Sequence, residues 1–372
     1  MHGTKILEEA DRLMTVCNSC RYCEGLCAVF PAMEMRRAFS DGDLNYLANL
    51  CHGCGACYTD CQFSPPHEYN VNVPQTFAVA RAESYAAYAW PRAFSGLFAR
   101  NGLAIALIAA LSVTAFIFGF AAFNDHAVLY GVHTGPGAFY QLMPHNAMAA
   151  LFGAAFLYAI VALVMGVRAF WRDIGEPVGG KADAGSLLQA MRDAGELRYL
   201  DGGGVGCFNE DDHPTDRRKI YHHLTFYGFA LCFAATSVAT LYHYMLAREA
   251  PYPGWDLPVV LGTLGGIGLL IGPIGLLTEK WKRDPVLVDQ KRMGMDVAFI
   301  AMLFLTALTG IALLLLRETA AMGPLLALHL GLVFALFITM PYGKFVHGIY
   351  RYVALVRYAR ERQMMLHGAA AE

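Results

Sequence analysis

The sequence predicts an all-α protein in which a small helical head, residues 1–95, is attached to a bundle of six membrane-spanning helices, residues 96–372. Two observations predict this class. Apolar residues make up 56% of the 372-residue chain and charged residues only 16%, which is too hydrophobic for an ordinary water-soluble domain. In addition, eight of the ten cysteines lie within the first 61 residues. The chain therefore divides into a cysteine-rich head and a hydrophobic remainder.

The head contains two cysteine runs with the same spacing, C-x2-C-x2-C-x3-C. The first run is Cys17, Cys20, Cys23 and Cys27, and the second is Cys51, Cys54, Cys57 and Cys61. This spacing is the signature of ferredoxins that carry two 4Fe–4S clusters, in which the last cysteine of each run binds the cluster of the other run. The signature assigns one cluster to Cys17, Cys20, Cys23 and Cys61, and the other to Cys51, Cys54, Cys57 and Cys27.

Zinc sites and disulfides are the alternatives to clusters. Zinc ribbons use cysteine pairs that are separated by longer gaps. Disulfides do not suit a chain whose first 16 residues include Glu8, Glu9 and Asp11 and no apolar segment, because this is not a secretory signal. We therefore expect two 4Fe–4S clusters in a ferredoxin-like head on the cytoplasmic side.

Six apolar stretches after the head are long enough to span a bilayer. They cover residues 102–123, 147–170, 224–246, 258–278, 297–316 and 324–349, and a polar inner loop, 171–220, separates the second from the third. With both termini inside, only Arg248 and Arg317 of the 28 Lys and Arg fall outside. The positive-inside rule therefore predicts a multi-pass protein of the bacterial cytoplasmic membrane with cytoplasmic N- and C-termini.

The predicted membrane helices contain several histidines near their ends. The absence of Asp and Glu from the middle of the spans argues against an ion-coupled transporter. His329 and His347 are five helical turns apart and would share one face of the sixth span. Opposite them on the third span are His222 and His243, so two imidazoles would meet at each of two depths. That arrangement suits bis-histidine haem b, at least one and at most two, with iron ligands His222, His347, His243 and His329.

The spacing of the histidines does not decide which of them bind haem or where quinone binds. His223 is an alternative to His222, and a histidine at a membrane boundary is often only an interfacial hydrogen-bonding residue. His145, with His126 and His133 before it, and the turn 340–344 are candidate quinone contacts, but the quinone site stays unassigned.

The glycine cluster 202–206 has no preceding strand and no following apolar helix, so we expect no flavin on this chain. Cys207 and Cys232 are expected to be packing residues.

Nearly the whole chain resembles the tricarballylate-utilisation protein B family, also labelled CitB, which is similar to the C-terminal half of the fused cobalamin-pathway protein CobZ. The resemblance is carried by CNSCRYCEGLCAVFPAME (17–34), LCHGCGACYTDCQFSPPHEYNVNVP (50–74), GGGVGC (202–207), RRKIYHHLTFYGFALCFAAT (217–236), LGTLGGIGLLIGPIGLL (261–277) and MPYGKFVHGIYR (340–351). It implies a membrane iron–sulfur protein that reoxidises the reduced flavin of a soluble FAD-dependent dehydrogenase.

From the residues and the resemblance together we expect an oxidoreductase electron-transfer subunit. It would take electrons from the FADH2 of a tricarballylate dehydrogenase-like partner and pass them through two 4Fe–4S clusters and haem b to quinone, with no nucleic-acid partner. It would reduce quinone only together with the flavoprotein. Two alternatives are a redox subunit of a monooxygenase-like biosynthetic system, as in the cobalamin-pathway relative, and a haem-free membrane-anchored ferredoxin.

Overall fold

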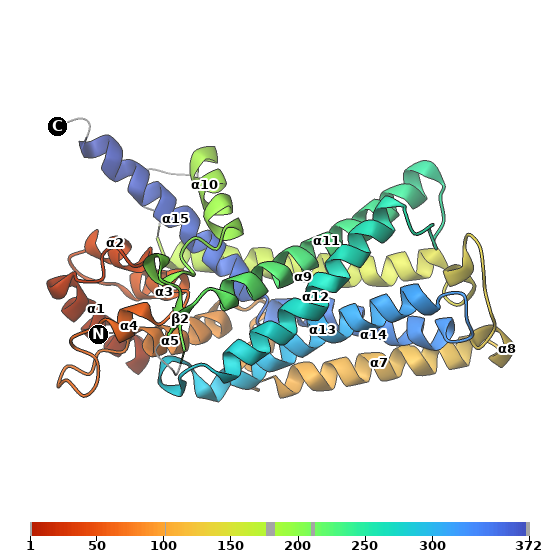
Figure 1. Ribbon diagram of the computed structural model, residues 1–372, viewed down its shortest axis with the longest axis horizontal. Helices are drawn as coiled ribbons and strands as arrows, with labels where there is room; N and C mark the ends of the chain where they lie inside the picture. Colours follow the sequence, from red (N-terminus) through yellow and green to blue (C-terminus); the bar gives the residue numbers. More distant parts are fainter. Residues whose placement is uncertain (1, 101, 176–182, 210–212, 370–372) are drawn as a thin grey trace.

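The computed structural model describes residues 2–100, 102–175, 183–209 and 213–369, and their regular structure is almost entirely helical (Figure 1). The strands among these residues are β1 (Cys207–Phe208) and β2 (Pro214–Thr215), which pair antiparallel. The prediction of an all-α protein with a small head and six apolar helices is confirmed.

Five helices form the head: α1 (Lys5–Cys20), α2 (Val29–Glu34), α3 (Asp41–Leu50), α4 (Ala56–Thr59) and α5 (Val73–Tyr88). Capping side chains determine where the three longer helices, α1, α3 and α5, begin. Thr4 caps α1, Ser40 and Asp43 form a reciprocal capping box on α3, and Asn72 caps α5. The three helices bury their apolar faces on a common core that includes Leu13, Leu47 and Phe77.

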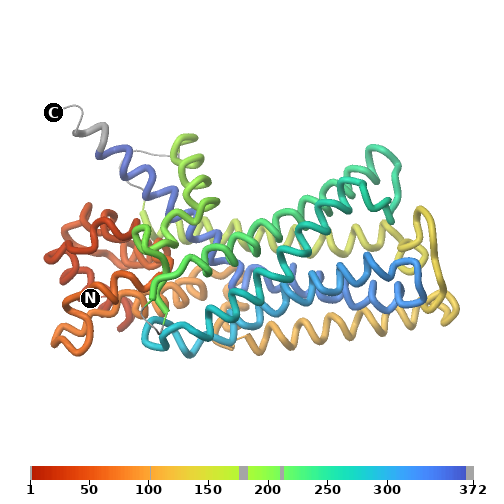
Figure 2. Tube along the Cα trace, in the orientation of Figure 1, coloured from red at the N-terminus to blue at the C-terminus, as the bar shows by residue number. Residues whose placement is uncertain are grey.

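Six long helices form the membrane domain: α7 (Leu103–Phe123), α9 (His145–Asp173), α11 (Arg217–Leu246), α12 (Leu257–Trp281), α13 (Met293–Leu316) and α14 (Met322–Thr339). Each is long and apolar enough to cross a membrane. Short elements connect them: η1 (Arg92–Phe94) and α6 (Gly96–Ala99) before α7, α8 (His126–Leu129) and η2 (Ala138–Gln141) after it, and η4 (Pro285–Leu287) and η5 (Gln290–Arg292) before α13. The head lies at one end of the bundle and α8 at the other (Figures 1 and 2).

Glycines allow α11 and α12 to pack closely along their length. A Cβ atom at Gly265 would lie 2.7 Å from the carbonyl oxygen of Gly228, and one at Gly268 would lie 2.9 Å from that of Leu224. Small residues at such spacing let two membrane helices approach until their backbones touch. The pair runs obliquely to the other spans in Figure 1. Gly228 is the single buried residue among the thirty of α11, and the others are partly or fully exposed.

The sixth apolar stretch, 324–349, does not form one continuous helix. Helix α14 ends at Thr339, the turn η6 (Met340–Tyr342) follows, Gly343 is extended, and a separate helix, α15 (Val346–Ala369), begins beyond it. Pro341 lacks the N–H group that a continuous helix needs, which explains the break.

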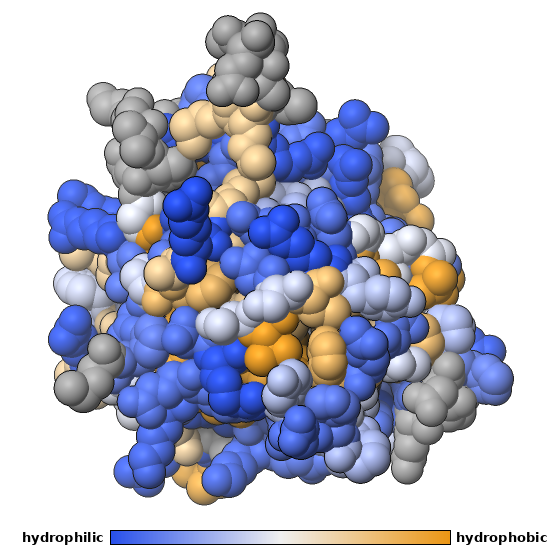
Figure 3. Space-filling view, turned by 90° about the vertical axis from the view of Figure 1, so that its left-hand side faces the viewer, coloured by the Kyte–Doolittle hydropathy of each residue, from blue (hydrophilic) through white to orange (hydrophobic). Residues whose placement is uncertain are grey.

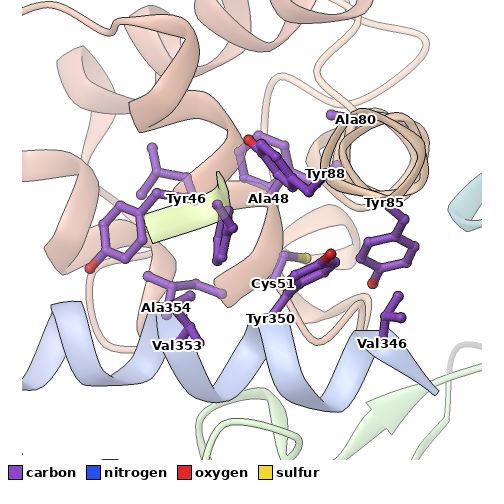
Figure 4. Packing of buried hydrophobic residues seen from close by; sticks show 14 of the residues in the cluster. Tyr46, Ala48, Cys51, Ala80, Tyr85, Tyr88, Val346, Tyr350, Val353 and Ala354 are labelled. Atoms are coloured by element: carbon purple, nitrogen blue, oxygen red, sulfur yellow. The ribbon is translucent and has the colours of Figure 1, made fainter. Parts of the chain in front are cut away.

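The last helix, α15, belongs to the head. It packs against α3, α9 and α10 (Ala184–Gly195). In Figure 4, Tyr350, Val353 and Ala354 of α15 face Tyr46 and Tyr85 of the head. Tyr350 stacks on Tyr85 with ring centres 5.7 Å apart.

Charge is distributed unevenly between the two ends of the molecule. Arg248 follows α11 and Arg317 follows α13, both at the end far from the head. The end face of the head, viewed along the bundle in Figure 3, is mostly hydrophilic. The head end therefore carries the basic residues that the topology prediction places inside.

Candidate metal centre

The structure brings Cys61 to the first cysteine run. Cys17 and Cys20 end α1, Cys23 lies in the following turn, and Cys61 follows α4. Burial, together with smaller contributions from the neighbouring thiols Cys20 and Cys61, raises the pKa of Cys17 and of Cys23 to about 12. Thiolates bind iron, so a site that disfavours thiolates this strongly needs a cationic core among them.

The structure brings Cys27 to the second cysteine run. A cavity is lined by four cysteines, Cys27, Cys51, Cys54 and Cys57. Cys51 caps the end of α3, and Gly53 and Gly55 have positive φ angles of 61° and 96° that turn the chain around the cavity. Burial raises the pKa of Cys54 to about 11 and the pKa of Cys27 and Cys57 well above the usual value.

These two sets of thiols are the ones that the crossed assignment names. No group of three or more His, Cys, Asp or Glu among the described residues is arranged to hold a single metal ion. A 4Fe–4S cube requires a wider arrangement, because four iron atoms lie between the four sulfurs. The donor set of four cysteines per site fits such a cluster, and ligation itself remains a prediction.

The sequence did not reveal what covers the second cysteine set. The glycine turn η3 (Gly202–Gly204) lies over it, and a Cβ atom at Gly202 would be 3.0 Å from that of Ala56 and 3.9 Å from the sulfur of Cys54. The backbone N–H of Phe208 donates to the carbonyl of Cys54 at 2.9 Å. The glycine cluster 202–206 is the sequence signal for this cover, because only glycine lets the backbone approach the cysteine set so closely.

His222 and His347 lie ring to ring at the head end of the membrane domain. Their ring centres are 6.0 Å apart and the rings are inclined by 75°. Two imidazoles held this close together are a donor set that could hold a haem iron. Nδ1 of His347 lies 2.5 Å from the carbonyl oxygen of Lys344, whereas Nδ1 of His222 is buried without a hydrogen-bond partner. The spacing of the two rings fits a haem iron between them.

His223 faces away from this pair. Its Nε2 lies 3.2 Å from the carbonyl oxygen of Gly195, and its ring lies beside Tyr227. The geometry therefore favours His222 over the alternative His223 as the partner of His347.

His52 connects the second cysteine set with the histidine pair. It is 6% exposed, lies between Cys51 and Gly53, and its Nδ1 is 2.9 Å from the carbonyl oxygen of Leu50. Burial lowers the pKa of His52 well below its usual value, and the nearby Arg351, Arg218 and His222 lower it further. The ring is therefore neutral at physiological pH, and the cysteine cavity and the histidine pair are neighbours.

The expected outer pair, His243 and His329, is not formed. His243 stacks on His145 with ring centres 3.5 Å apart, while Nδ1 of His329 lies 3.0 Å from the hydroxyl of Thr309 on α13. The reason is the helix packing, since α11 packs mainly on α12, whereas α14 packs on α7, α13 and α9. In addition, the break at η6 removes the shared helix face of His329 and His347. Nδ1 of both His145 and His243 is buried without a hydrogen-bond partner.

The other candidate quinone contacts have protein partners. His133 lies 2.7 Å from the carbonyl oxygen of Val128, and His126 lies beside Tyr130. In the turn 340–344, the Tyr342 hydroxyl donates to the carbonyl of Trp90 at 2.9 Å, and Lys344 pairs with Asp296 at 2.8 Å. Through these contacts the turn 340–344 joins α14 and α15 to the head.

Known protein families match both the head and the membrane part of the chain. The family model described as Citrate utilization protein B matches residues 96–368, and the model described as Citrate utilization protein B Fer4-like domain matches residues 10–87. A relative from Escherichia coli with the description Citrate utilization protein B is 50% identical over 359 residues, which are 95% of this chain and 92% of the relative. No solved structure matches the chain. The chain therefore belongs to the citrate utilization protein B family.

Proposed function

We propose that this chain is a membrane electron-transfer protein that reoxidises the reduced flavin of a partner dehydrogenase and delivers the electrons to quinone. The observation that carries the proposal is one continuous series of sites. It begins at the partly exposed set Cys17, Cys20, Cys23 and Cys61, continues through the second set, of which Cys51 and Cys54 are buried, and reaches His222 and His347 beside His52. An iron–sulfur role agrees with the Fer4-like domain.

The protein's part in this function is to hold and insulate the redox groups. When bound, the 4Fe–4S clusters supply one-electron acceptor and donor states between a two-electron flavin and the membrane. Cys51 and Cys54 are 7% and 8% exposed, Cys27 and Cys57 are partly exposed, and the glycine turn lies over Cys54, so water has less access to the second site than to the first. The first set is more accessible, which makes it the side from which a soluble partner can approach.

His222 and His347 would hold haem b. His347 has its Nδ1 occupied by the carbonyl oxygen of Lys344, which would fix the tautomer that directs Nε2 towards iron. Two imidazoles on one iron would leave no open coordination position. That arrangement supports electron transfer over the oxygen chemistry of the monooxygenase-like alternative.

We place the head and both termini in the cytoplasm and the bundle in the bacterial inner membrane. The six apolar helices are compatible with a multi-pass membrane protein, and the basic residues at the head end support this orientation. The partner we propose is a soluble FAD-dependent dehydrogenase. Its organic substrate is set by the partner's own pocket.

An anaerobic reoxidation experiment tests the proposal. The full chain in lipid vesicles is reduced with one equivalent of dithionite per cluster and mixed with a water-soluble quinone, while the iron–sulfur absorbance is followed. We expect rapid reoxidation and formation of quinol. Clusters that stay reduced in the presence of quinone would rule the function out. Reoxidation of the wild type at the same rate as a His222→Ala variant would instead support the haem-free ferredoxin.

A further inference from the structure

Four arginines from four different elements converge on the backbone that carries the second cysteine set. They are Arg81 of α5, Arg218 of α11, Arg283 in the loop after α12, and Arg351 of α15. We call these four side chains the arginine collar. Three of the four elements lie outside the first 100 residues, so the collar also joins the head to the rest of the chain.

The collar reaches every carbonyl group from residue 51 to residue 54. Arg81 and Arg351 both donate to the carbonyl oxygen of Cys51, at 2.8 and 2.9 Å. Arg218 donates to Gly53 at 2.7 Å and to His52 at 3.2 Å. Arg283 donates to Cys54 at 3.0 Å and also to Gly53.

Arg283 is buried, and the other three arginines of the collar are partly exposed. Arg283 is 8% exposed, and Nε of Arg351 is buried without a hydrogen-bond partner. None of the four arginines forms a salt bridge with a described carboxylate. The guanidinium group of arginine keeps its charge at neutral pH. Buried cations need a counter-charge, and the thiolates of the second set are the anions at hand.

The first cysteine set has a different charge environment. The carboxylate of Asp60 acts on Cys23 of this set, whereas Arg283 acts on Cys54 of the second set. One arginine, Arg21, donates to a carbonyl of this run, that of Asn18 at 3.1 Å. Arg21 is exposed, so water screens its charge. The two sites therefore have the same kind of ligands, but among the described residues four arginines donate to the backbone of the second run and one exposed arginine to that of the first.

We propose that the arginine collar holds the second cluster at a higher reduction potential than the first, so that the second cluster is the point where electrons leave the head towards His222 and His347. Reduction adds one negative charge to a cluster, and nearby cations stabilise that charge. One electron leaves the first cluster as one arrives at the second, and no proton or further reactant is required. The inference rests on the proposed function in that it needs two clusters.

A redox titration of the detergent-purified full chain, followed by electron paramagnetic resonance, tests the proposal. The signal of the second cluster is identified in a Cys61→Ser variant, which should retain only that cluster. In the wild type we expect the second cluster to be reduced before the first. Arg283→Gln and Arg218→Gln should each lower the potential of the second cluster and leave that of the first unchanged, and Arg283→Lys should stay close to the wild type because it keeps the charge.

Arg292→Gln is the matched control. Arg292 also donates to a head carbonyl, that of Val79 at 3.4 Å, but it contacts neither cysteine set in the structure. The Arg292→Gln variant should not shift the reduction potential of either cluster. Equal potentials in the wild type, or a shift of both clusters in Arg283→Gln, would overturn the proposal, as would loss of the second cluster's iron in both glutamine variants. Absence of iron from the wild type would instead overturn the proposed function itself.

Discussion

Cys61 is the residue that distinguishes crossed ligation from two independent cysteine runs. It belongs to the second run in the sequence, but in the structure it adds to the raised pKa of Cys17 and Cys23. We predict that Cys61→Ser loses the first cluster and retains the second, so that iron per chain falls by about half. Iron analysis and the visible spectrum check this.

Cys232→Ser is the control for that prediction. Cys232 lies within α11 and its sulfur is 4.0 Å from the carbonyl oxygen of Gly262, far along the chain from either cysteine set. The Cys232→Ser variant should keep the full iron content of the wild type. Loss of the second cluster in Cys61→Ser, with the first retained, would contradict crossed ligation.

The cysteine sets could be predicted from the sequence because their spacing is local and chemically specific. The histidine pairs could be predicted only in part. His222 and His347 were named from depth in the membrane, and the structure places their rings side by side. The partner of His243 could not be predicted, because it depends on which helices pack together, and periodicity within one helix contains no such information.

At the scale of elements, the α11–α12 pair depends on its glycines. We predict that Gly265→Ala destabilises the protein by about 1–3 kcal/mol, since the new methyl group would meet the backbone of α11 at 2.7–2.8 Å. The midpoint of thermal unfolding in detergent should fall. Gly119→Ala on α7, where nothing lies within 4 Å, should leave the midpoint unchanged or raise it. Equal effects of both changes would argue against close helix packing.

Helix α15 is attached to the head by an ion-pair network. Arg36 and Arg357 bond to Asp43 at 2.7 and 3.2 Å, and Arg357 also pairs with Glu361 at 2.9 Å. Burial would raise the pKa of Asp43, but the hydrogen bond from Arg36 and those from Ser40 outweigh it, so the pKa lies below its usual value. A lowered pKa stabilises the folded form above the unfolded value of about 3.9, and this stability is lost as pH falls through the folded value.

We therefore predict that acidification from about pH 5 to about pH 3 loosens α15 from α3. The protection factors of residues 346–365, which correct the exchange rates for their intrinsic pH dependence, should fall over this range. Asp43→Asn should exchange faster already at pH 5 and show a weaker pH dependence. Protection factors in the wild type that do not change over this range would contradict the role of the network.

The sixth span shows where sequence reasoning on elements fails. Hydropathy continues from 324 to 349, and nothing in the apolar pattern separates α14 from α15. Pro341 indicated a possible break, but its consequence depended on Tyr342 and Lys344 finding partners at Trp90 and Asp296. Such contacts join segments that are remote in sequence, so one-dimensional patterns do not report them.

At the scale of the whole molecule, the orientation in the membrane follows from the placement of charge. We predict that green fluorescent protein fused after residue 372 fluoresces, and that alkaline phosphatase fused there is inactive. Phosphatase fused after Arg248, between α11 and α12, should be active because this loop would be periplasmic. The reverse pattern would place the head outside the cytoplasm.

Iron and haem content per chain, with a reduced-minus-oxidised visible spectrum, is the measurement that tests the account most directly. We predict about eight non-haem iron atoms for two 4Fe–4S clusters, together with a low-spin b-type haem spectrum. The haem should be lost in His222→Ala and in His347→Ala and retained in His223→Ala. A wild-type protein without non-haem iron, or a haem that survives the loss of both His222 and His347, would contradict the account.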